Sequence, residues 1–384
     1  MMMNTSFDVI ICGAGPAGST SALALRDSGL KVALIDKNTF PRDKICGDAV
    51  APYVPKVLRT IHPDYERAFN QFRSKEIVTT LRVVAPNTKA VDLNFPTEGA
   101  ISMRMHLDQL LFEQAAALPN ITTFLKHTVQ DVQVNNDGTQ VTLSGGIQLD
   151  AALVIGCDGA QGIVSKKLTD NKIDFLHNSA AVRSYYKNVK GIPDGTFELH
   201  YLKDLMPGYF WIFPLPDGHA NVGLGMLSQT VSDQKINLRK KLPQIIEETP
   251  YLKARFEGAE KLESTKGFGL PLGSRKVTIS GHRFMLCGDA AALIDPLSGE
   301  GIGQAIISGR YAGWHAKECF KTNDFSAGFM QAYNKMVYDK LWQEHRIHYF
   351  TQRIISNRPW LVNSFANIAL KSPFMLRIFQ RMFW

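Results

Sequence analysis

A glycine-rich turn near the N-terminus constrains the fold most strongly. Residues 7–12 (FDVIIC) are apolar enough for a buried parallel strand, and 13–18 (GAGPAG) follow as G-x-G-x-x-G before a predicted helix over 16–29. The next predicted strand, 31–36, ends in Asp36. Glycines at this spacing let backbone N–H groups approach a pyrophosphate, and the acid can accept hydrogen bonds from a ribose. The chain therefore begins with a dinucleotide-binding βαβ unit.

The remaining pattern predicts that this nucleotide fold is interrupted and later resumed. Between about 176 and 275 the chain changes to strands rich in aromatic residues, with Pro/Gly turns and one polar helix near 229–247. A strand over 282–287 and a helix over about 299–317 then return to the nucleotide-binding pattern. Other strands are predicted before the interruption, and we expect some of them to join the first sheet: 76–84, 90–95, 121–134, 139–143 and 152–156.

We therefore predict an α/β fold with three parts. The parts are a discontinuous Rossmann-like domain (1–175 and 276–320), an antiparallel-sheet substrate domain (176–275) and a helical C-terminal region (321–384). A chain of 384 residues with 45% hydrophobic and 20% charged side chains can bury a core of this size.

The cysteines indicate neither a disulfide framework nor a zinc site. All five are widely spaced, with no C-x-x-C pair and no histidines at ligand spacing. We therefore expect no metal and a reducing, cytoplasmic location. No basic leader precedes the first strand, and no uninterrupted apolar stretch of about 18 residues predicts a spanning helix.

Much of the net charge of +8 comes from the C-terminal segment. After Glu344 there is no Asp or Glu, and cations alternate with apolar residues: Arg346, Arg353, Arg358, Lys371, Arg377 and Arg381. This favours peripheral contact with a membrane over nucleic-acid binding, with a set of aromatic residues directed into the lipid: Trp360, Phe365, Phe374, Phe379, Phe383 and Trp384. The alternative is a helical cap packed on the nucleotide-binding domain.

Three later segments indicate FAD rather than NAD. Residues 157–159 (CDG) and 288–291 (GDAA) each follow a predicted strand, and 296–303 (PLSGEGIG) open the next helix. A helix beginning there would direct free N–H groups at a flavin ring and stabilise its reduced, anionic form. With 104–111 (RMHLDQLL), these segments resemble the para-hydroxybenzoate hydroxylase-like flavoproteins over nearly the whole chain.

This resemblance implies how FAD is bound. Asp289 would contact the ribityl chain, Arg104 would reach the phosphates, and the backbone of Val129 would contact the adenine. The residues expected to bind FAD are Gly13, Gly15, Ala17, Gly18, Asp36, Lys37, Arg42, Gly47, Arg104, Val129, Asp289, Pro296, Gly301 and Ile302.

Two further segments resemble the geranylgeranyl reductase family. Residues 40–47 (FPRDKICG) match its P-x-x-x-x-C-G segment, although the family usually has a second glycine where this chain has Asp48. Residues 209–214 (YFWIFP) match its Y-x-W-x-F-P motif. Alternation along a strand would put Tyr209, Trp211 and Phe213 on one face as an aromatic wall, and we expect these residues and Pro214 to bind a hydrophobic substrate.

The resemblance implies reduction of C=C bonds in an isoprenoid-type substrate by hydride from N5 of reduced FAD. Cys46 is the expected catalytic residue, because its thiol could donate a proton or orient the substrate. No separate nicotinamide-binding fold is evident, so NADPH would bind transiently or a ferredoxin-like protein would supply electrons. Two alternatives stay open: a monooxygenase or flavin-dependent halogenase acting on an aromatic or polyene substrate, and a non-catalytic lipid-binding flavoprotein.

Overall fold

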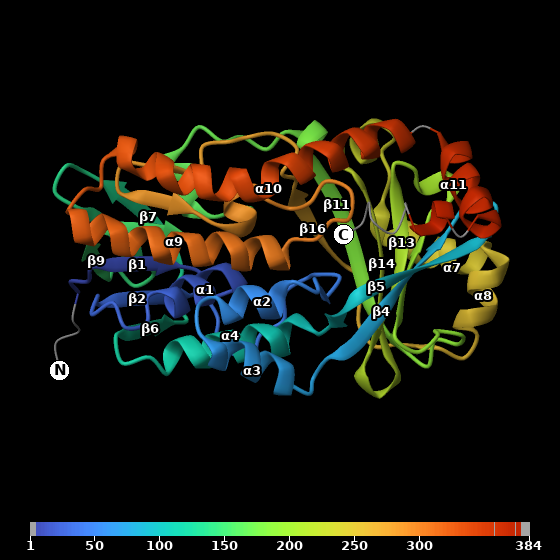
Figure 1. Cartoon of the computed structure of the whole chain (residues 1–384), viewed down its shortest axis with the longest axis horizontal. Coiled ribbons are helices and arrows are strands. Elements are labelled where there is room, and N and C mark those ends of the chain that lie inside the picture. Colours follow the sequence, from blue (N-terminus) through green and yellow to red (C-terminus); the bar gives the residue numbers. More distant parts are fainter. Residues whose placement is uncertain (1–4, 357, 373, 378–384) are drawn as a thin grey trace.

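Two large β-sheets stand next to each other along the long axis of the molecule (Figure 1). The structure is a computed structural model that describes residues 5–356, 358–372 and 374–377. The N-terminal strands and helices α1 and α9 build one half, the large sheet builds the other, and the long helix α10 runs over both (Figure 1). The fold is the mixed α/β architecture that the sequence predicts, with a helical C-terminal part.

The first sheet is the predicted nucleotide-binding sheet. Its order is β17-β18-β10-β1-β2-β6, and all its pairs are parallel except β17 with β18. The central strands are buried along their whole length, as expected for a parallel sheet covered on both faces. The bounds are β1 Val9–Cys12, β2 Val32–Asp36, β6 Ile121–Leu125, β10 Leu153–Gly156, β17 Ser280–Gly281 and β18 Phe284–Leu286.

Helices and a small sheet cover this first sheet. Helices α1 (Pro16–Ala24) and α9 (Ile302–Thr322) pack closely. Gly309 of α9 permits this approach, since a Cβ there would lie only 2.2 Å from the carbonyl oxygen of Ala17. The other elements of this half are α2 Val54–Arg59, α3 Pro63–Gln71, α4 Arg104–Ala116, α5 Ile163–Leu168, η4 Gly288–Ala291 and an antiparallel sheet of β7 Val129–Val134, β8 Thr139–Leu143 and β9 Gln148–Ala151.

The second sheet has nine strands in the order β15-β11-β14-β13-β12-β4-β5-β3, with β16 also paired to β11. Its pairs are antiparallel apart from β12 with β4. The bounds are β3 Ala49–Val50, β4 Glu76–Val84, β5 Ala90–Ile101, β11 Asn178–Lys187, β12 Thr196–His200, β13 Gly208–Leu215, β14 His219–Leu227, β15 Glu260–Lys261 and β16 Lys266–Pro271.

Three strands that precede the predicted substrate domain belong to this second sheet. β3, β4 and β5 fall within 1–175, the range that the sequence assigns to the nucleotide-binding domain. In β4, buried and more exposed positions alternate through most of the strand, a pattern typical of a sheet with one covered face rather than of a buried parallel strand. Of the strands expected to rejoin the first sheet, β6 and β10 do so.

The two faces of the second sheet have different neighbours. Helices α7 (Leu238–Glu248) and α8 (Pro250–Phe256) share a core with the face that carries Phe210 and Ile212. The opposite face carries Trp211 and Phe213, and part of α11 packs into the same cluster. The remaining short elements here are η1 Phe175–His177, η2 Lys203–Leu205, η3 Pro216–Gly218 and α6 Ser228–Asp233.

The C-terminal helices contact both halves. In α10 (Ala327–Ile355), Met330, Tyr333 and Val337 are buried in the core around the first sheet. In α11 (Pro359–Lys371), Val362, Ala366 and Ala369 join the apolar cluster of the second sheet. No helix in the described ranges is long and apolar enough to cross a bilayer.

Candidate active site

The glycine turn between β1 and α1 has the shape that a diphosphate needs. Gly13 has a φ of +99°, and a Cβ there would meet the carbonyl of Cys157 at 2.3 Å. A Cβ at Gly18 would lie 1.7 Å from the carbonyl oxygen of Gly13, so this glycine permits close packing of helix on strand. At Gly15 the nearest atom is a guanidinium nitrogen of Arg42 at 3.5 Å. Gly13 and Gly18 therefore have no room for a side chain, whereas Gly15 has space in front of it and faces the Arg42 guanidinium.

Two arginines converge on this open side. Arg42 donates to Asp108 at 2.9 Å and to Asp36 at 3.2 Å, and Arg104 donates to both oxygens of Asp108 at 2.6 and 2.8 Å. Burial alone would lower the pKa of Arg104, but the charge of Asp108 raises it, so the guanidinium stays charged although only 3% exposed. The buried Nε of Arg42 has no hydrogen-bond partner. An unsatisfied guanidinium N–H beside an open glycine turn fits the diphosphate of FAD.

The acid at the end of β2 lies where a ribose-binding residue belongs. The carboxylate of Asp36 accepts the N–H groups of Ala14 and Asn38, each at 3.0 Å, and is 7% exposed. Lys37 beside it is exposed. Val129 is the first residue of β7, two residues after His127, whose N–H donates to the carbonyl of Asp36. Ala17 is buried under Gly288 and Gly309 and serves the packing of α1.

The turn before α9 closes the other end of the site. Asp289 in η4 accepts a hydrogen bond of 2.8 Å from Lys44, which belongs to the loop after β2. Asp295 holds the 296–303 segment by accepting the N–H groups of Leu297 and Ser298 at 3.0 and 2.7 Å. Gly301 is the N-cap of α9 and Ile302 its first residue, and both line the cavity described next, as does Pro296. The N-terminus of α9 thus faces this cavity, as the sequence predicts for a flavin ring.

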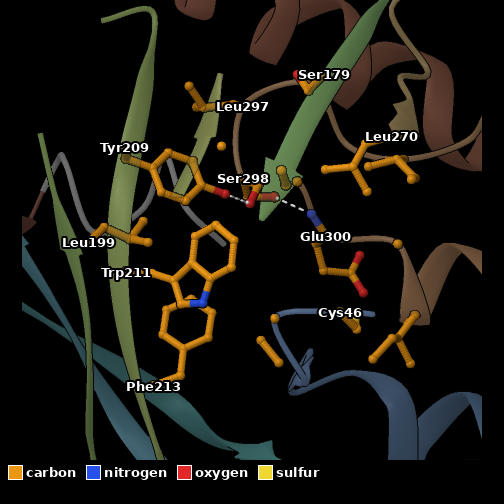
Figure 2. A pocket seen from close by; sticks show the side chains of 18 of the residues that line it. Cys46, Ser179, Leu199, Tyr209, Trp211, Phe213, Leu270, Leu297, Ser298 and Glu300 are labelled. Atoms are coloured by element: carbon orange, nitrogen blue, oxygen red, sulfur yellow. Dashed lines mark hydrogen bonds between the residues drawn. The ribbon is translucent and has the colours of Figure 1, made fainter. Parts of the chain in front are cut away.

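A cavity of about 340 Å³ joins these elements to the second sheet. It extends from Pro16, Arg104 and Asp289 to apolar side chains of β4, β12, β13 and β16 and to the end of α10. The three aromatic residues of β13 lie along one face of that strand and line the cavity, with Cys46 across from them (Figure 2). We call Tyr209, Trp211 and Phe213 the aromatic wall. Pro214 lies on the other face of β13 and is not among the described residues that line the cavity.

Cys46 lies in the loop that connects the two halves of the site. Burial raises the pKa of its thiol, the charge of Arg104 lowers it, and the carboxylate of Asp48 raises it again. The thiol is therefore protonated at neutral pH and available as a proton donor. The next residue, Gly47, touches the wall, because a Cβ there would lie 3.3 Å from a ring carbon of Phe213.

Two acids in the cavity wall were not singled out as site residues by the sequence. Asp48 is fully buried, and its burial raises the pKa of the carboxyl to about 6. Glu300 accepts hydrogen bonds from the hydroxyl of Tyr53 at 3.0 Å and the N–H of Gly303 at 2.6 Å, and burial raises its pKa to about 7. Asp48 stands where the family usually has a second glycine, and Glu300 lies within the 296–303 segment, but neither acid had a sequence pattern that assigned it a role.

Comparison with known proteins agrees with this geometry. Residues 6–176 match the family of FAD binding domains. The fold and the site therefore define an FAD-dependent oxidoreductase. Digeranylgeranylglycerophospholipid reductase 1 of Methanosphaera stadtmanae is 30% identical over 332 residues, which are 85% of this chain and 79% of the relative. The chain belongs to the geranylgeranyl reductase family.

Other relatives and solved structures support the same assignment. Menaquinone reductase of Mycobacterium tuberculosis is 29% identical over 81% of this chain and 77% of its own. The crystal structure of a geranylgeranyl bacteriochlorophyll reductase-like protein from Thermoplasma acidophilum superposes with a TM-score of 0.82 and 25% identity, covering 94% of this chain and 91% of that one. A halogenase in complex with phloroglucinol and FAD has a TM-score of 0.77 over 98% and 85% of the chains, but at 16% identity it shows only the shared fold.

Proposed function

We propose that this protein uses reduced FAD to hydrogenate C=C bonds in the isoprenoid chain of a lipid or quinone. The observation that carries the proposal is the continuous cavity from Arg104 and Pro16, next to the glycine turn, past Cys46, to the aromatic wall. Digeranylgeranylglycerophospholipid and menaquinone, the molecules in the names of its relatives, both carry long unsaturated apolar chains. An apolar, partly enclosed slot suits such a chain.

The chain's own residues would bind, orient and protonate the alkene. Bound reduced FAD would supply hydride to one alkene carbon. The aromatic wall would hold the apolar chain, with about 1.5–3 kcal/mol for each large side chain that it covers. The neutral thiol of Cys46 would hold a proton for the neighbouring carbon. An isolated alkene has no charge to stabilise, so alignment and exclusion of water carry more of the task than strong acids or bases.

Anaerobic turnover tests the proposal against the oxygen-dependent alternatives. Dithionite-reduced protein is incubated with digeranylgeranyl lipids, menaquinone or polyprenyl diphosphates, and the masses of the products are measured by mass spectrometry. We expect a gain of two hydrogens per reduced bond without oxygen, located in the isoprenoid chain by fragmentation, because dithionite alone adds two hydrogens to a quinone ring. A product that forms only with oxygen, or only with halide, would instead assign a monooxygenase or halogenase. Failure to convert every substrate would favour the non-catalytic lipid-binding flavoprotein.

Variants of two cysteines test whether the Cys46 thiol has a catalytic or a structural role. Cys46→Ser should lower turnover while flavin stays bound, because the alcohol keeps the size of the side chain but is a far weaker acid than the thiol. Cys319→Ala is the matched control, since this thiol is buried in α9 away from the cavity. Loss of flavin from Cys46→Ser would make Cys46 a structural residue.

The electron donor is proposed to be NADPH or a ferredoxin-like protein. The described residues contain one parallel nucleotide-binding sheet, and the features described above assign it to FAD. A nicotinamide donor would therefore bind transiently. Anaerobic mixing of the oxidised flavoprotein with NADPH or with a reduced ferredoxin distinguishes the two, because only the true donor bleaches the flavin rapidly.

We also propose that the end of α10 and the start of α11 contact a lipid surface. Large apolar side chains are exposed here, among them Phe350 (59%), Ile354 (50%) and Trp360 (61%), and Phe374, after the end of α11, is 71% exposed. Arg346, Arg353 and Arg358 are exposed in the same segment. Phe365 instead packs on the second sheet, and Phe379, Phe383, Arg381 and Trp384 lie outside the described residues. Since Gln352 and Ile355 of α10 also line the cavity, lipid could enter from this side.

A further inference from the structure

Asp48 joins three parts of the site through one carboxylate. Its Oδ2 accepts the hydroxyl of Tyr185 at 2.8 Å and the amide of Asn221 at 2.7 Å, from β11 and β14 of the second sheet. Its Oδ1 accepts the backbone N–H of Arg104, at the start of α4, at 3.3 Å. The residue is fully buried and lines the cavity. It therefore fixes the loop after β2 to both halves of the molecule.

The backbone conformation at Asp48 is one that favours glycine. Its φ is +69°, in the left-handed region that a non-glycine residue occupies at a cost of about 1 kcal/mol. A glycine would adopt this conformation freely. The chain thus carries a buried carboxyl at a position where the backbone alone favours glycine. Strain of this kind persists where surrounding contacts hold the residue in place.

The same hydrogen bonds reach the backbone of Cys46 and the aromatic wall. The amide of Asn221 donates both to Asp48 and to the carbonyl oxygen of Cys46, each at 2.7 Å. The indole N–H of Trp211 donates to the side-chain oxygen of Asn221 at 2.9 Å. A polar chain therefore runs from the wall to the loop, and both of its ends line the cavity.

The charged groups around Asp48 leave its proton exchangeable near neutral pH. Burial raises the pKa of the carboxyl, and hydrogen bonds from Asn221 and Tyr185 and the charges of Arg183 and Arg104 lower it, with a result of about 6. Arg183 stands over the Tyr185 ring at 3.9 Å from its centroid. The carboxylate of Asp48 in turn raises the pKa of the Cys46 thiol, which the charges of Arg104 and Lys44 lower.

We propose that Asp48 is a positioning residue that acts through Cys46 and returns the proton that this thiol gives to the alkene. The inference rests on the proposed function. One alkene carbon gains hydride from reduced FAD, which becomes oxidised, and the other gains the thiol proton as the S–H bond breaks. The carboxyl of Asp48 then protonates the thiolate and is itself reprotonated from water. The sum is one hydride and one proton added across the double bond.

The first test compares single and repeated turnover of the FAD-loaded protein. Asp48→Asn keeps an oxygen that accepts from Asn221 but cannot return a proton. We expect its first reduction to proceed within about two-fold of wild type and its steady-state rate to fall by about 10- to 100-fold. The wild-type steady-state rate should decline as pH rises through about 6, because the protonated carboxyl is then lost, and the variant should show no such decline.

The second test needs neither substrate nor FAD. Alkylation of Cys46 by iodoacetamide, followed by peptide mass mapping, reports the thiolate fraction. Removing the like charge of Asp48 should speed this alkylation by about 3- to 10-fold near pH 8. Glu198→Gln is the matched control, because this buried carboxyl belongs to β12 of the second sheet but hydrogen-bonds to His200 and Arg255 away from the cavity. It should change neither readout.

Two results would overturn the proposal. One is an unchanged pH profile and steady-state rate in Asp48→Asn, and the other is an unchanged alkylation rate. If Asp48→Asn folds poorly, Asp48→Gly serves instead, because glycine suits the left-handed backbone there. If wild type turns over no substrate, the proposed function fails while alkylation still decides whether Asp48 acts on Cys46.

Discussion

The ammonium of Lys44 lies 2.8 Å from the carboxylate of Asp289, although 245 residues separate them in sequence. This ion pair joins the loop after β2 to the turn before α9, so the two ends of the flavin site are held together. Burial would raise the pKa of Asp289, but the charges of Lys44 and Arg104 hold it below its usual range. The carboxylate is thus ionised and able to accept hydrogen bonds from the ribityl hydroxyls of FAD.

Asp289→Ala should therefore release flavin. Loss of a buried charged acceptor costs about 1.5–3 kcal/mol, which corresponds to a 10- to 150-fold weaker affinity for FAD. The ratio of flavin absorbance to protein after purification and a calorimetric titration measure it. Glu257→Ala removes the exposed ion pair with Lys190 and should leave flavin content unchanged. Full flavin occupancy in Asp289→Ala would remove Asp289 from the cofactor site.

Two glycines of the first turn should respond differently to alanine. A methyl at Gly15 meets nothing closer than 3.5 Å, so Gly15→Ala should fold but hinder the approach of a diphosphate. A methyl at Gly18 would meet the Gly13 carbonyl oxygen at 1.7 Å, so Gly18→Ala should destabilise the domain itself. Thermal unfolding and flavin content separate the two effects. Equal stability losses in both variants would contradict this description of the turn.

The sequence predicts the flavin-binding half well because its signals are local. A strand, a glycine turn and a helix lie within 7–29, and Asp36 closes the next strand, so neighbouring residues alone define the unit. The alternation along β13 likewise predicts the aromatic wall, since each strand residue points opposite to the next. Tyr209, Trp211 and Phe213 accordingly lie on one side of the strand (Figure 2). Ala17 shows the limit of such reasoning: its burial under α9 depends on a helix almost three hundred residues away.

Contacts between distant strands could not be read from the sequence. The alternation of β4 shows that one face is covered, but not that its neighbours are β12 and β5. Asp48 meets Tyr185 and Asn221 across 137 and 173 residues, so its role follows only from the sheet order. Pro214 was expected to contact substrate from its motif alone, and the strand places it on the other face.

Asp48 and Glu198 should affect stability with opposite dependence on pH. The pKa of Asp48 is raised to about 6 in the fold, so its favourable contribution exists at low pH and is lost as pH rises through about 6. Wild type should therefore lose stability as the pH rises from about 5 to about 8, and Asp48→Asn should not. The free energy of unfolding of Asp48→Asn relative to wild type should rise by about 1–3 kcal/mol over this range. Urea unfolding at both pH values measures this difference.

Glu198 supplies the contrast. Burial would raise its pKa, but hydrogen bonds from His200 and Arg255 lower it. A lowered pKa stabilises the fold above the ordinary value near 4.5 and loses that contribution as pH falls. Glu198→Gln should thus be less stable than wild type at about pH 8, with a smaller deficit in acid. The same sign for both variants would contradict the assigned shifts.

Removing one ring from the aromatic wall should weaken substrate binding without releasing flavin. Trp211→Ala removes a large ring from the cavity, so the KM for a polyprenyl substrate should rise by about 10-fold or more. Phe210→Leu on the opposite face is the control, because its side chain packs under α7 and α8. That change should lower stability but leave KM within about two-fold. An unchanged KM in Trp211→Ala would place the substrate elsewhere.

The exposed apolar residues of α10 and α11 predict binding to anionic vesicles. Phe350→Ser with Trp360→Ser removes two side chains that are 59% and 61% exposed, so folding should be little affected while vesicle binding falls by about 10-fold or more. Leu262→Ser, an apolar residue 40% exposed near β15, is the matched control and should bind normally. Cosedimentation with phosphatidylglycerol vesicles at low and high salt separates the apolar contribution to binding from the electrostatic one. Salt weakens only the electrostatic contribution of Arg346, Arg353 and Arg358. Equal binding by all three proteins would mean that α11 only covers the second sheet, and lipid would then have to reach the cavity by another route.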